Sequence, residues 1–528
     1  MVYLSSITIC CKKKIKMIKY KYNYDYKGER AMERIFTKGE RFVDASGRQR
    51  IFNGINLCDK GTPNADNTAK VYNLDFDEEL IVRLKKCGFN LVRLGLTWDG
   101  VEPQPGKYNG EYIAKVKKVA DSCEKHGMYF FLDMHQDLYG GAVDTPADGA
   151  PMWACMTDGY KFKPTKFVWA EGYFWGKAIH RCFDHFWAND IVCGKPIQEH
   201  YCDMWKYLAK EFEGYTSLFG FDIMNEPFPG TPGGKVFRKL IGSVVFSGLF
   251  DRRVHRAQLL KDALRGETRH KVLDQFDDPD FFSHIVTRGG GKIIKDFDEN
   301  YYSLFLNRVA TAIREVTDKG IIIMENCYYS NLSIPCSTPA VTVNGKRESQ
   351  LCFAPHGYDL MVDTPDYKYA SNSRTGAIFD EHKRTQKRLN VPVFVGEWGG
   401  SGGNEDKTWL NHINFLLDKF DENQWGQTYW AYTGDMFDTV VMESLVRTAP
   451  VAVTGTIDSY RTDRENGIFV LKYTQGYDFK EPTEIFVHKT PARIETDGEY
   501  EFVKTDGAQG GVLKVRTGTG KHKVIISF

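Results

Sequence analysis

Short apolar runs alternate with segments of helical periodicity along residues 51–430, and this alternation restricts the chain to few folds. Strands buried on both faces read as continuous apolar runs, whereas helices packed on them repeat apolar residues every three to four positions. The runs that we read as strands are Ile51–Leu57, Asn90–Leu94, Tyr129–Met134, Leu218–Met224, Ile321–Met324, Leu351–Ala354, Val393–Val395 and Gln427–Trp430. Strands in this number, with helices between them, predict an α/β fold built as a (β/α)₈ TIM barrel.

The residues after Met442 follow a different pattern. The helical period is lost, and short alternating runs separated by turn residues fill the rest of the chain. Such runs predict a small C-terminal β-sandwich over residues 443–528, which leaves residues 35–442 for the barrel. Near the start of the barrel unit, Phe42–Asp44 and Gln49–Phe52 are predicted to pair as strands across a turn.

The first residues, 1–34, show no core pattern. Lys12–Lys14 directly follow a mildly apolar start, and no small-residue cleavage site appears, so the segment is a poor secretory signal. Lys27–Arg30 can be encoded by a purine-rich run that resembles a bacterial ribosome-binding site just ahead of Met32. We therefore expect a disordered or non-native leader, with translation of the native protein starting at Met32 rather than at Met1.

The composition narrows the classes of partner. The formal net charge is only +1, with no basic block beyond the amino-terminal segment, which argues against nucleic acid. The aromatic share of 14% exceeds what a core requires and is typical of sugar- or lipid-binding clefts. Twelve scattered cysteines without metal-type pair spacing favour a reducing, cytoplasmic compartment, with secretion as the alternative. No apolar run is long enough to cross a bilayer.

Two long insertions interrupt the repeat, at Tyr139–Asn189 and Pro229–Glu299. Each follows the carboxyl end of a strand, where parallel barrels keep their active sites, so both should lie over the catalytic face. Either they build a small subsidiary core, or their apolar residues line a groove for a lipid-like part of a substrate. Within the second insertion, Gly289–Gly291 is interpreted as a hinge.

Two strands end in a glutamate. Glu226 follows the run Leu218–Met224 and precedes Pro227, which stops the strand because proline has no N–H to donate. Glu397 also follows an apolar run, Val393–Val395, and it precedes Trp398, Gly399 and Gly400. Glycosidic bond cleavage needs two such carboxylates, one to protonate the leaving oxygen and one to attack the sugar. Either glutamate alone could simply end a strand beside a turn, but the pair predicts glycosidase chemistry.

Other polar or aromatic side chains at strand ends are Arg93, His135, Asp137, Asn225, His356, Tyr358 and Trp430. Barrel closure should bring them together around the two glutamates. We assign Glu397 as the nucleophile, kept ionised by Arg93 and hydrogen-bonded by Tyr358. Glu226 is the acid/base, held protonated by its negative neighbour. A lone His135 or His356 is more often structural than catalytic.

Asn225 and Trp430 are predicted to contact the sugar, through its 2-hydroxyl group and by stacking on the pyranose ring. No metal or other cofactor is predicted, because His135 and Asp137 lack a third ligand at metal spacing.

Several motifs together resemble retaining enzymes of glycoside hydrolase family 5 and, more narrowly, the endoglycoceramidases. They are Asn53–Leu57 with Asp59-Lys60, Asp133–Gly140, Gly149–Trp153, Phe183–Trp187, Asn225–Pro227, His356–Asp359, Gly396–Gly399 and Leu445–Pro450. The similarity covers roughly residues 40 to 490. It implies that Lys60, Asp137, Asn225, Tyr358 and Trp430 line a sugar subsite, that Glu226 and Glu397 are catalytic, and that no metal is needed.

The leading hypothesis is a retaining β-glycosidase that cleaves the glycan–ceramide bond of glycosphingolipids by double displacement. It would act as a monomer, with transient contact to a membrane or micelle surface. The alternatives are an exo-acting glucosylceramidase or β-glucosidase, a soluble β-glucanase of the same family, and a glycolipid-binding protein without activity.

Overall fold

The computed structural model describes residues 32–66, 69–141, 147–166, 168–264, 270–364, 366–400 and 407–528. The predicted leader up to residue 31 lies outside the described residues. Among those described, no helix is both long and apolar enough to span a bilayer.

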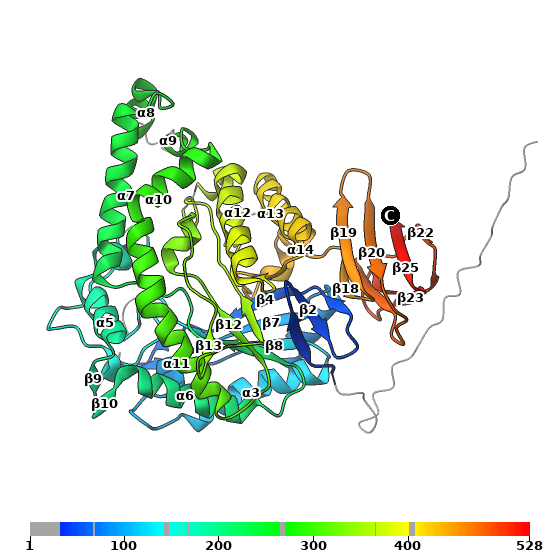
Figure 1. Cartoon of the computed structure of the whole chain (residues 1–528), viewed down its shortest axis with the longest axis horizontal. Helices are drawn as coiled ribbons and strands as arrows, with labels where there is room; N and C mark the ends of the chain where they lie inside the picture. Colours follow the sequence, from blue (N-terminus) through cyan, green and yellow to red (C-terminus); the bar gives the residue numbers. More distant parts are fainter. Residues whose placement is uncertain are drawn as a thin grey trace, which may run out of the picture.

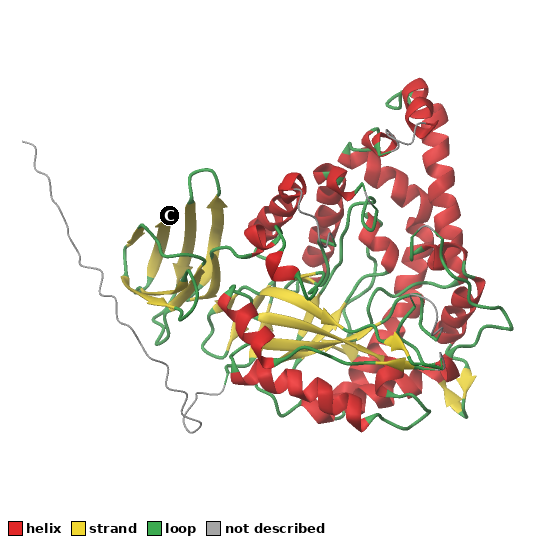
Figure 2. Cartoon of the chain, turned by 180° about the vertical axis from the view of Figure 1, so that it is seen from behind, coloured by secondary structure: helices red, strands yellow, loops and turns green. Residues whose placement is uncertain are grey.

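The eight parallel strands of the central sheet overlap the eight predicted runs and form the predicted TIM barrel (Figures 1 and 2). They are β4 (Asn53–Cys58), β7 (Leu91–Thr97), β8 (Tyr129–His135), β11 (Leu218–Asp222), β12 (Ile321–Met324), β15 (Leu351–Phe353), β16 (Phe394–Val395) and β17 (Gly426–Tyr429). Their order is β15-β12-β11-β8-β7-β4-β17-β16. Parallel bridges from Phe353 to Val393 and from His356 to Glu397 join the two outer strands and close the barrel.

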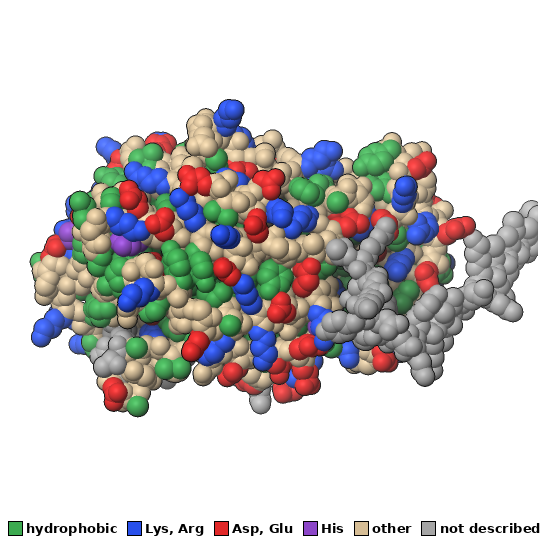
Figure 3. Space-filling view, turned by 90° about the horizontal axis from the view of Figure 1, so that it is seen from below, with side chains coloured by type: hydrophobic (Ala, Val, Ile, Leu, Met, Phe, Trp, Pro, Cys, Tyr) green, Lys and Arg blue, Asp and Glu red, His purple; other side chains and the backbone are tan. Residues whose placement is uncertain are grey.

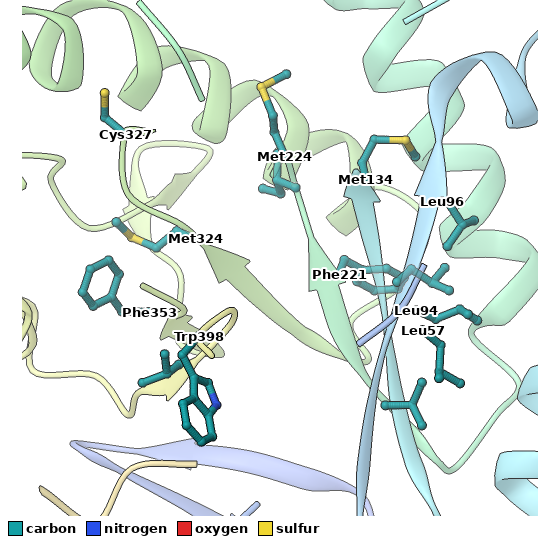
Figure 4. Close-up of a cluster of buried hydrophobic side chains, with 14 of the residues drawn as sticks. Leu57, Leu94, Leu96, Met134, Phe221, Met224, Met324, Cys327, Phe353 and Trp398 are labelled. Carbon is teal, nitrogen blue, oxygen red and sulfur yellow. The ribbon is translucent and has the colours of Figure 1, made fainter. Parts of the chain in front are cut away.

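Amphipathic helices surround the barrel, as the periodicity predicts. They are α1 (Glu78–Lys86), α3 (Gly110–Lys125), α6 (Ile197–Phe212), α11 (Ser303–Arg314), α12 (Asn372–Leu389) and α13 (Leu410–Asn423). Asp77 caps α1 by accepting a hydrogen bond from the backbone N–H of Leu80, which satisfies one otherwise free donor. Leu80, Ile81 and Leu84 then bury one face of the helix. Figure 4 shows strand residues such as Leu57, Leu94 and Phe221 in this core.

The insertions contain helices that the sequence patterns did not indicate. The first holds α4 (Glu171–Trp175), α5 (Lys177–Ala188) and the short strands β9 (Ile191–Val192) and β10 (Lys195–Pro196). The second holds α7 (Thr231–Phe250), α8 (Arg256–Leu264), α9 (Lys271–Asp274), α10 (Pro279–Phe297) and the π-helical turn η3 (Asp298–Tyr302). Smaller elements are β5 (Thr62–Pro63), β6 (Lys70–Val71), α2 (Trp98–Val101), β13 (Thr342–Val343), β14 (Lys346–Arg347) and α14 (Met442–Leu445).

The interpretation of Gly289–Gly291 as a hinge is wrong, because all three residues lie inside α10. Their small size serves close packing instead. A Cβ atom on Gly289 would lie 3.1 Å from the Cα atom of Leu240 in α7, and one on Gly290 would lie 2.5 Å from Ile334. Glycine at these positions lets α10 approach α7 more closely than any larger residue would.

The C-terminal part forms two antiparallel sheets. One has the order β1 (Ile35–Lys38), β2 (Arg41–Asp44), β3 (Gln49–Arg50), β18 (Ala449–Val453), β21 (Thr483–Val487), β24 (Gly511–Arg516) and β23 (Glu499–Lys504). The other has the order β19 (Thr456–Asp463), β20 (Ile468–Gln475), β25 (Gly520–Ser527) and β22 (Arg493–Thr496). Apolar residues of both sheets form a separate core that includes Phe469, Leu471 and Leu513.

The predicted pairing of the early strands is confirmed, because β2 pairs with β3. However, β3 also pairs with β18, so the amino-terminal strands extend a C-terminal sheet. A buried ion pair between Arg447 and Asp421 of α13, with an Nη2–Oδ1 distance of 2.8 Å, further ties this part to the barrel.

Candidate active site

The backbone around Glu226 is fixed by its neighbours. Glu226 has a left-handed φ of 41°, which is uncommon for a residue with a side chain. The side-chain amide of Gln136 donates hydrogen bonds to the carbonyl oxygens of Asn225 (2.9 Å) and Glu226 (3.1 Å). The backbone N–H of Glu226 donates to Oε2 of Glu325 at 2.8 Å. These bonds hold the turn that directs the Glu226 carboxyl group inward.

Glu226 and Glu397 lie on the same side of the barrel, together with His356. Each of the three residues offers one oxygen or nitrogen atom, and these atoms lie within 4.8 Å of one another. Carboxyl groups about 5–5.5 Å apart suit a retaining mechanism, whereas inverting enzymes separate them by about 6.5–9.5 Å to admit a water molecule. The spacing therefore suits direct attack by one carboxylate on the sugar.

Glu397 is surrounded by donors. The Arg93 guanidinium donates from Nη1 to Oε1 at 2.7 Å, and the Tyr358 hydroxyl donates to Oε2 at 3.1 Å. A guanidinium and a hydroxyl group at these distances fix the orientation of the Glu397 carboxyl group. The two contacts are those that the sequence predicted, and a glutamate carboxyl group oriented in this way is suited to act as nucleophile.

Glu226 has a different environment. The Asn331 amide donates to its Oε1 at 2.8 Å, and Nδ1 of His356 lies 3.0 Å from the same oxygen. Burial raises the pKa of Glu226 to about 7, the nearby Glu397 adds to this, and the His356 contact opposes it. The sequence interpretation named the negative neighbour as the cause, but burial is the larger one. A carboxyl group that is half protonated near neutral pH can both give and take a proton.

Glu325 is an important residue of this cluster that the sequence analysis missed. It follows β12 directly, so the rule that identified Glu226 and Glu397 could also have found it. Its Oε1 lies 2.7 Å from Nη2 of Arg93 and 3.2 Å from Nε2 of His356. Glu325 therefore connects the residues beside Glu397 with those beside Glu226. Asn331, in the 3-10 helix Tyr328–Leu332 that follows β12, carried no such sequence signal.

Lys60, Asp137, His135 and Trp430 form the other polar wall. Nζ of Lys60 is ion-paired with Asp137 and lies 4.9 Å from the centre of the Trp430 ring. The His135 ring stacks on Trp430 with centroids 5.2 Å apart. A tryptophan face beside a charged donor and a carboxylate is a suitable surface for a sugar ring and its hydroxyl groups.

Three of the predicted substrate-binding residues are not among those that line the open part of the site. Arg93, Asn225 and His356 are almost fully buried and contact other side chains of the cluster. The Asn225 amide, predicted to reach a sugar hydroxyl, accepts from Arg93 at 2.8 Å and donates to the Gln136 carbonyl oxygen at 3.0 Å.

The prediction that His135 and Asp137 lack a third ligand is wrong. Asp148 lies close enough for one atom from each residue to fall within 4.8 Å of the others. The sequence gives no sign of this third residue, because Asp148 is held beside Asp137 by reciprocal backbone hydrogen bonds, both 3.0 Å long. Nζ of Lys60 lies 3.6 Å from Oδ2 of Asp148 and also pairs with Asp137, so an ammonium group already contacts both carboxylates.

A cavity of about 510 Å³ extends from these polar residues into the second insertion. Its polar end contains Glu226, Glu397, Tyr358, Lys60, His135, Asp137 and Trp430. Its far walls are apolar and include Phe237, Leu240, Val244, Val245, Phe276, Phe282, Ile285 and Val286. Both interpretations of the second insertion therefore hold in part, since Val254, Phe276, Phe281 and Ile285 also form a small core of their own.

Comparison with known proteins identifies the family of this chain. A family model described as "Cellulase (glycosyl hydrolase family 5)" matches residues 43–245 and 299–435. The chain belongs to glycoside hydrolase family 5. The C-terminal domain described for this family matches residues 447–526. The chain is thus a glycoside hydrolase, and residues 246–298, which include α8, α9 and all of α10, fall outside the catalytic family match.

Named relatives of this family 5 enzyme include endoglycoceramidases. It is 26% identical over 461 residues to "Endoglycoceramidase I" of Rhodococcus hoagii (strain 103S), covering 85% of this chain and 78% of the relative. It is 30% identical over 209 residues to the endoglycoceramidase of Hydra vulgaris, covering 36% and 39% of the two chains. The solved endo-glycoceramidase II from Rhodococcus sp., in a ganglioside GM3 complex, has the same fold, with a TM-score of 0.68 at 22% identity, covering 93% and 99%.

The pKa of Glu226 leads to a prediction about pH. Glu226 must carry a proton in order to protonate a poor leaving group. For a substrate with such a leaving group, kcat/KM should therefore fall above about pH 7, approaching tenfold per pH unit. An aryl glycoside with a good leaving group needs no such proton, so its hydrolysis by the same protein should lack this alkaline decline. Parallel pH profiles of the two substrates test the assignment, and a shared alkaline decline would contradict it.

Proposed function

We propose that this enzyme is a retaining β-glycosidase that cleaves the bond between the glycan and the ceramide of glycosphingolipids. The observation that carries the proposal is a single cavity with two kinds of wall. One end has paired carboxylates and a tryptophan for a sugar, and the other is lined by aliphatic and phenyl side chains. A soluble glucan would leave the apolar walls uncovered, whereas a ceramide would fill them.

The proposed reaction has two steps. Glu397 attacks the anomeric carbon while Glu226 gives its proton to the glycosidic oxygen, so that the bond to ceramide breaks and a glycosyl ester forms on Glu397. Glu226, now a carboxylate, takes a proton from water, and the water oxygen displaces Glu397 from the anomeric carbon. Asn331 and His356 orient Glu226, and Arg93 and Tyr358 orient Glu397.

Paired substrates test this function. We expect a lactosylceramide-type substrate to release an intact oligosaccharide and ceramide, and to be cleaved at least about tenfold faster than the same glycan on a methyl group, because the apolar walls contribute only to the former. Faster hydrolysis of a soluble β-glucan would contradict the proposal. Glucose released from glucosylceramide, without oligosaccharide release from longer substrates, would assign exo action instead.

Two further parts of the proposal concern the lipid surface on which the enzyme acts and the compartment in which it is located. Such a substrate lies in a membrane or micelle, so the enzyme must contact that surface. We also propose a cytoplasmic location, supported by the ten cysteines of the described residues, which are all free thiols.

A further inference from the structure

The segment from Ile241 to Leu264, the end of α7 together with α8, exposes a continuous group of large apolar side chains. We call it the α7–α8 elbow. Its exposed members are Ile241, Val244, Val245, Phe246, Leu249, Phe250, Leu260 and Leu264, with exposed fractions of 37% to 77%. In Figures 1 and 2 these helices project beyond the barrel. On the face seen in Figure 3, by contrast, charged side chains of both signs are spread among the apolar ones.

The end of α7 has the opposite arrangement to that of a surface helix in a water-soluble domain. Its buried positions are small residues, Ser243, Ser247 and Gly248, and the Ser243 hydroxyl donates to the carbonyl oxygen of Ile285 in α10. Its large side chains point outward instead: Phe250 is 65% exposed and Leu249 is 54% exposed. A helix normally buries its large apolar residues and exposes its polar ones. The arrangement indicates that something apolar covers the elbow.

The elbow is continuous with the cavity of the proposed active site. Ile241, Val244 and Val245 are exposed and also line that cavity. An apolar chain could therefore move from the environment of the elbow to the catalytic end without crossing water. Residues 246–264 also fall outside the catalytic family match.

The charges of the segment fit an anionic surface. The elbow itself, residues 241–264, contains four basic and two acidic residues, a formal charge of +2, and the start of α7 adds Lys235, Arg238 and Lys239, in a chain whose total is +1. Asp262 is buried, and Asp251 is paired with Arg253 at 2.9 Å, which leaves exposed cations such as Arg252 and Arg256. Residues 270–288 carry four acidic and two basic residues, so the cationic character belongs to α7 and α8.

We propose that the α7–α8 elbow inserts into the surface of an anionic lipid membrane, with its apolar side chains at the acyl boundary and its cations near the phosphates. Docked there, the enzyme would draw a ceramide glycoside from the membrane along α7 into the cavity. The role of the elbow in delivering substrate rests on the proposed function, but the binding of the elbow to lipid does not depend on catalysis.

The test uses the full chain and vesicles that contain no glycolipid. We expect it to sediment with phosphatidylcholine vesicles that contain about one-fifth phosphatidylserine, more weakly with pure phosphatidylcholine, and less at high salt. The variant Phe246→Gln, Leu249→Gln, Phe250→Gln should lose about tenfold or more in vesicle affinity. The control Ile191→Gln, which replaces a 72% exposed residue on β9, should bind as the unaltered chain does.

Hydrolysis of a soluble aryl glucoside separates the two proposals. The triple variant should hydrolyse it at the unaltered rate, because none of the three residues lines the cavity, and this also shows that the variant is folded. Absence of that activity from the unaltered chain would count against the proposed function alone. Failure to bind either vesicle, or unchanged binding by the triple variant, would overturn the docking proposal. So would a dimer in solution that the triple substitution converts to a monomer, since a second copy would then cover the elbow.

Discussion

Replacing Glu397 by Gln is expected to lower kcat for a ceramide glycoside by roughly 10⁴- to 10⁶-fold, the scale of loss when a covalent enzyme loses its nucleophile. Glutamine keeps the size of the side chain, but its amide cannot form the glycosyl ester. The result should hold for every leaving group, because attack at the anomeric carbon begins all of the reactions. Measurement of kcat with a ceramide glycoside and with an activated aryl glycoside checks this.

Glu226→Gln provides the contrast. Its activity on the ceramide glycoside should fall by about 10²- to 10⁴-fold through loss of the acid, whereas an activated aryl glycoside should still react in the first step. The second step then lacks its base, so a glycosyl adduct should accumulate on Glu397 and appear in the intact-protein mass. Glu443→Gln, a surface substitution beside Lys407, should leave both rates unchanged. An adduct on Glu397→Gln, or equal effects of Glu226→Gln on both substrates, would contradict the assignment of roles.

The barrel could be predicted from the sequence because its strands are buried on both faces. Runs such as Ile321–Met324 have no polar residue to obscure them, and the turn residues between strands and helices are local signals. The C-terminal sheets were harder. The pairing of β3 with β18 joins residues about 400 positions apart, which no local pattern encodes.

The two carboxylates could be predicted because each follows an apolar run typical of a buried strand, and barrel closure makes strand ends neighbours. Glu325 obeys the same rule and was overlooked. Asp148 and Asn331 obey no such rule: they reach the site through an irregular loop and a short 3-10 helix, where position depends on contacts distant in sequence. The α7–α8 elbow shows a similar limit, because its apolar residues were interpreted as part of a small core or of a groove, and only the structure shows them to be exposed.

Replacing Arg93 by Met is expected to destabilise the protein by about 3–5 kcal/mol, the usual result of removing one partner from a buried ion pair. The Arg93 guanidinium is completely buried and contacts several carboxylates: Asp133 (3.0 Å), Asp222 (3.2 Å), Glu325 (2.7 Å) and Glu397 (2.7 Å). Their burial is tolerable only with a cation among them, since isolated buried charges are very costly. Methionine fills a similar volume without that charge.

The direction of the pH effect distinguishes lost charge from lost packing. Without Arg93, the buried carboxylates should have folded-state pKa values above their unfolded ones, so the folded state binds more protons than the unfolded chain. Stability of Arg93→Met should therefore improve relative to the unaltered chain as the pH falls from about 7 to 5, whereas a packing defect would be independent of pH. Thermal midpoints across that range measure it. Arg464→Met, which removes a surface pair with Asp418, should cost at most about 1 kcal/mol at every pH. A constant deficit for Arg93→Met would mean that its role is to fill space rather than to balance the charge of the buried carboxylates.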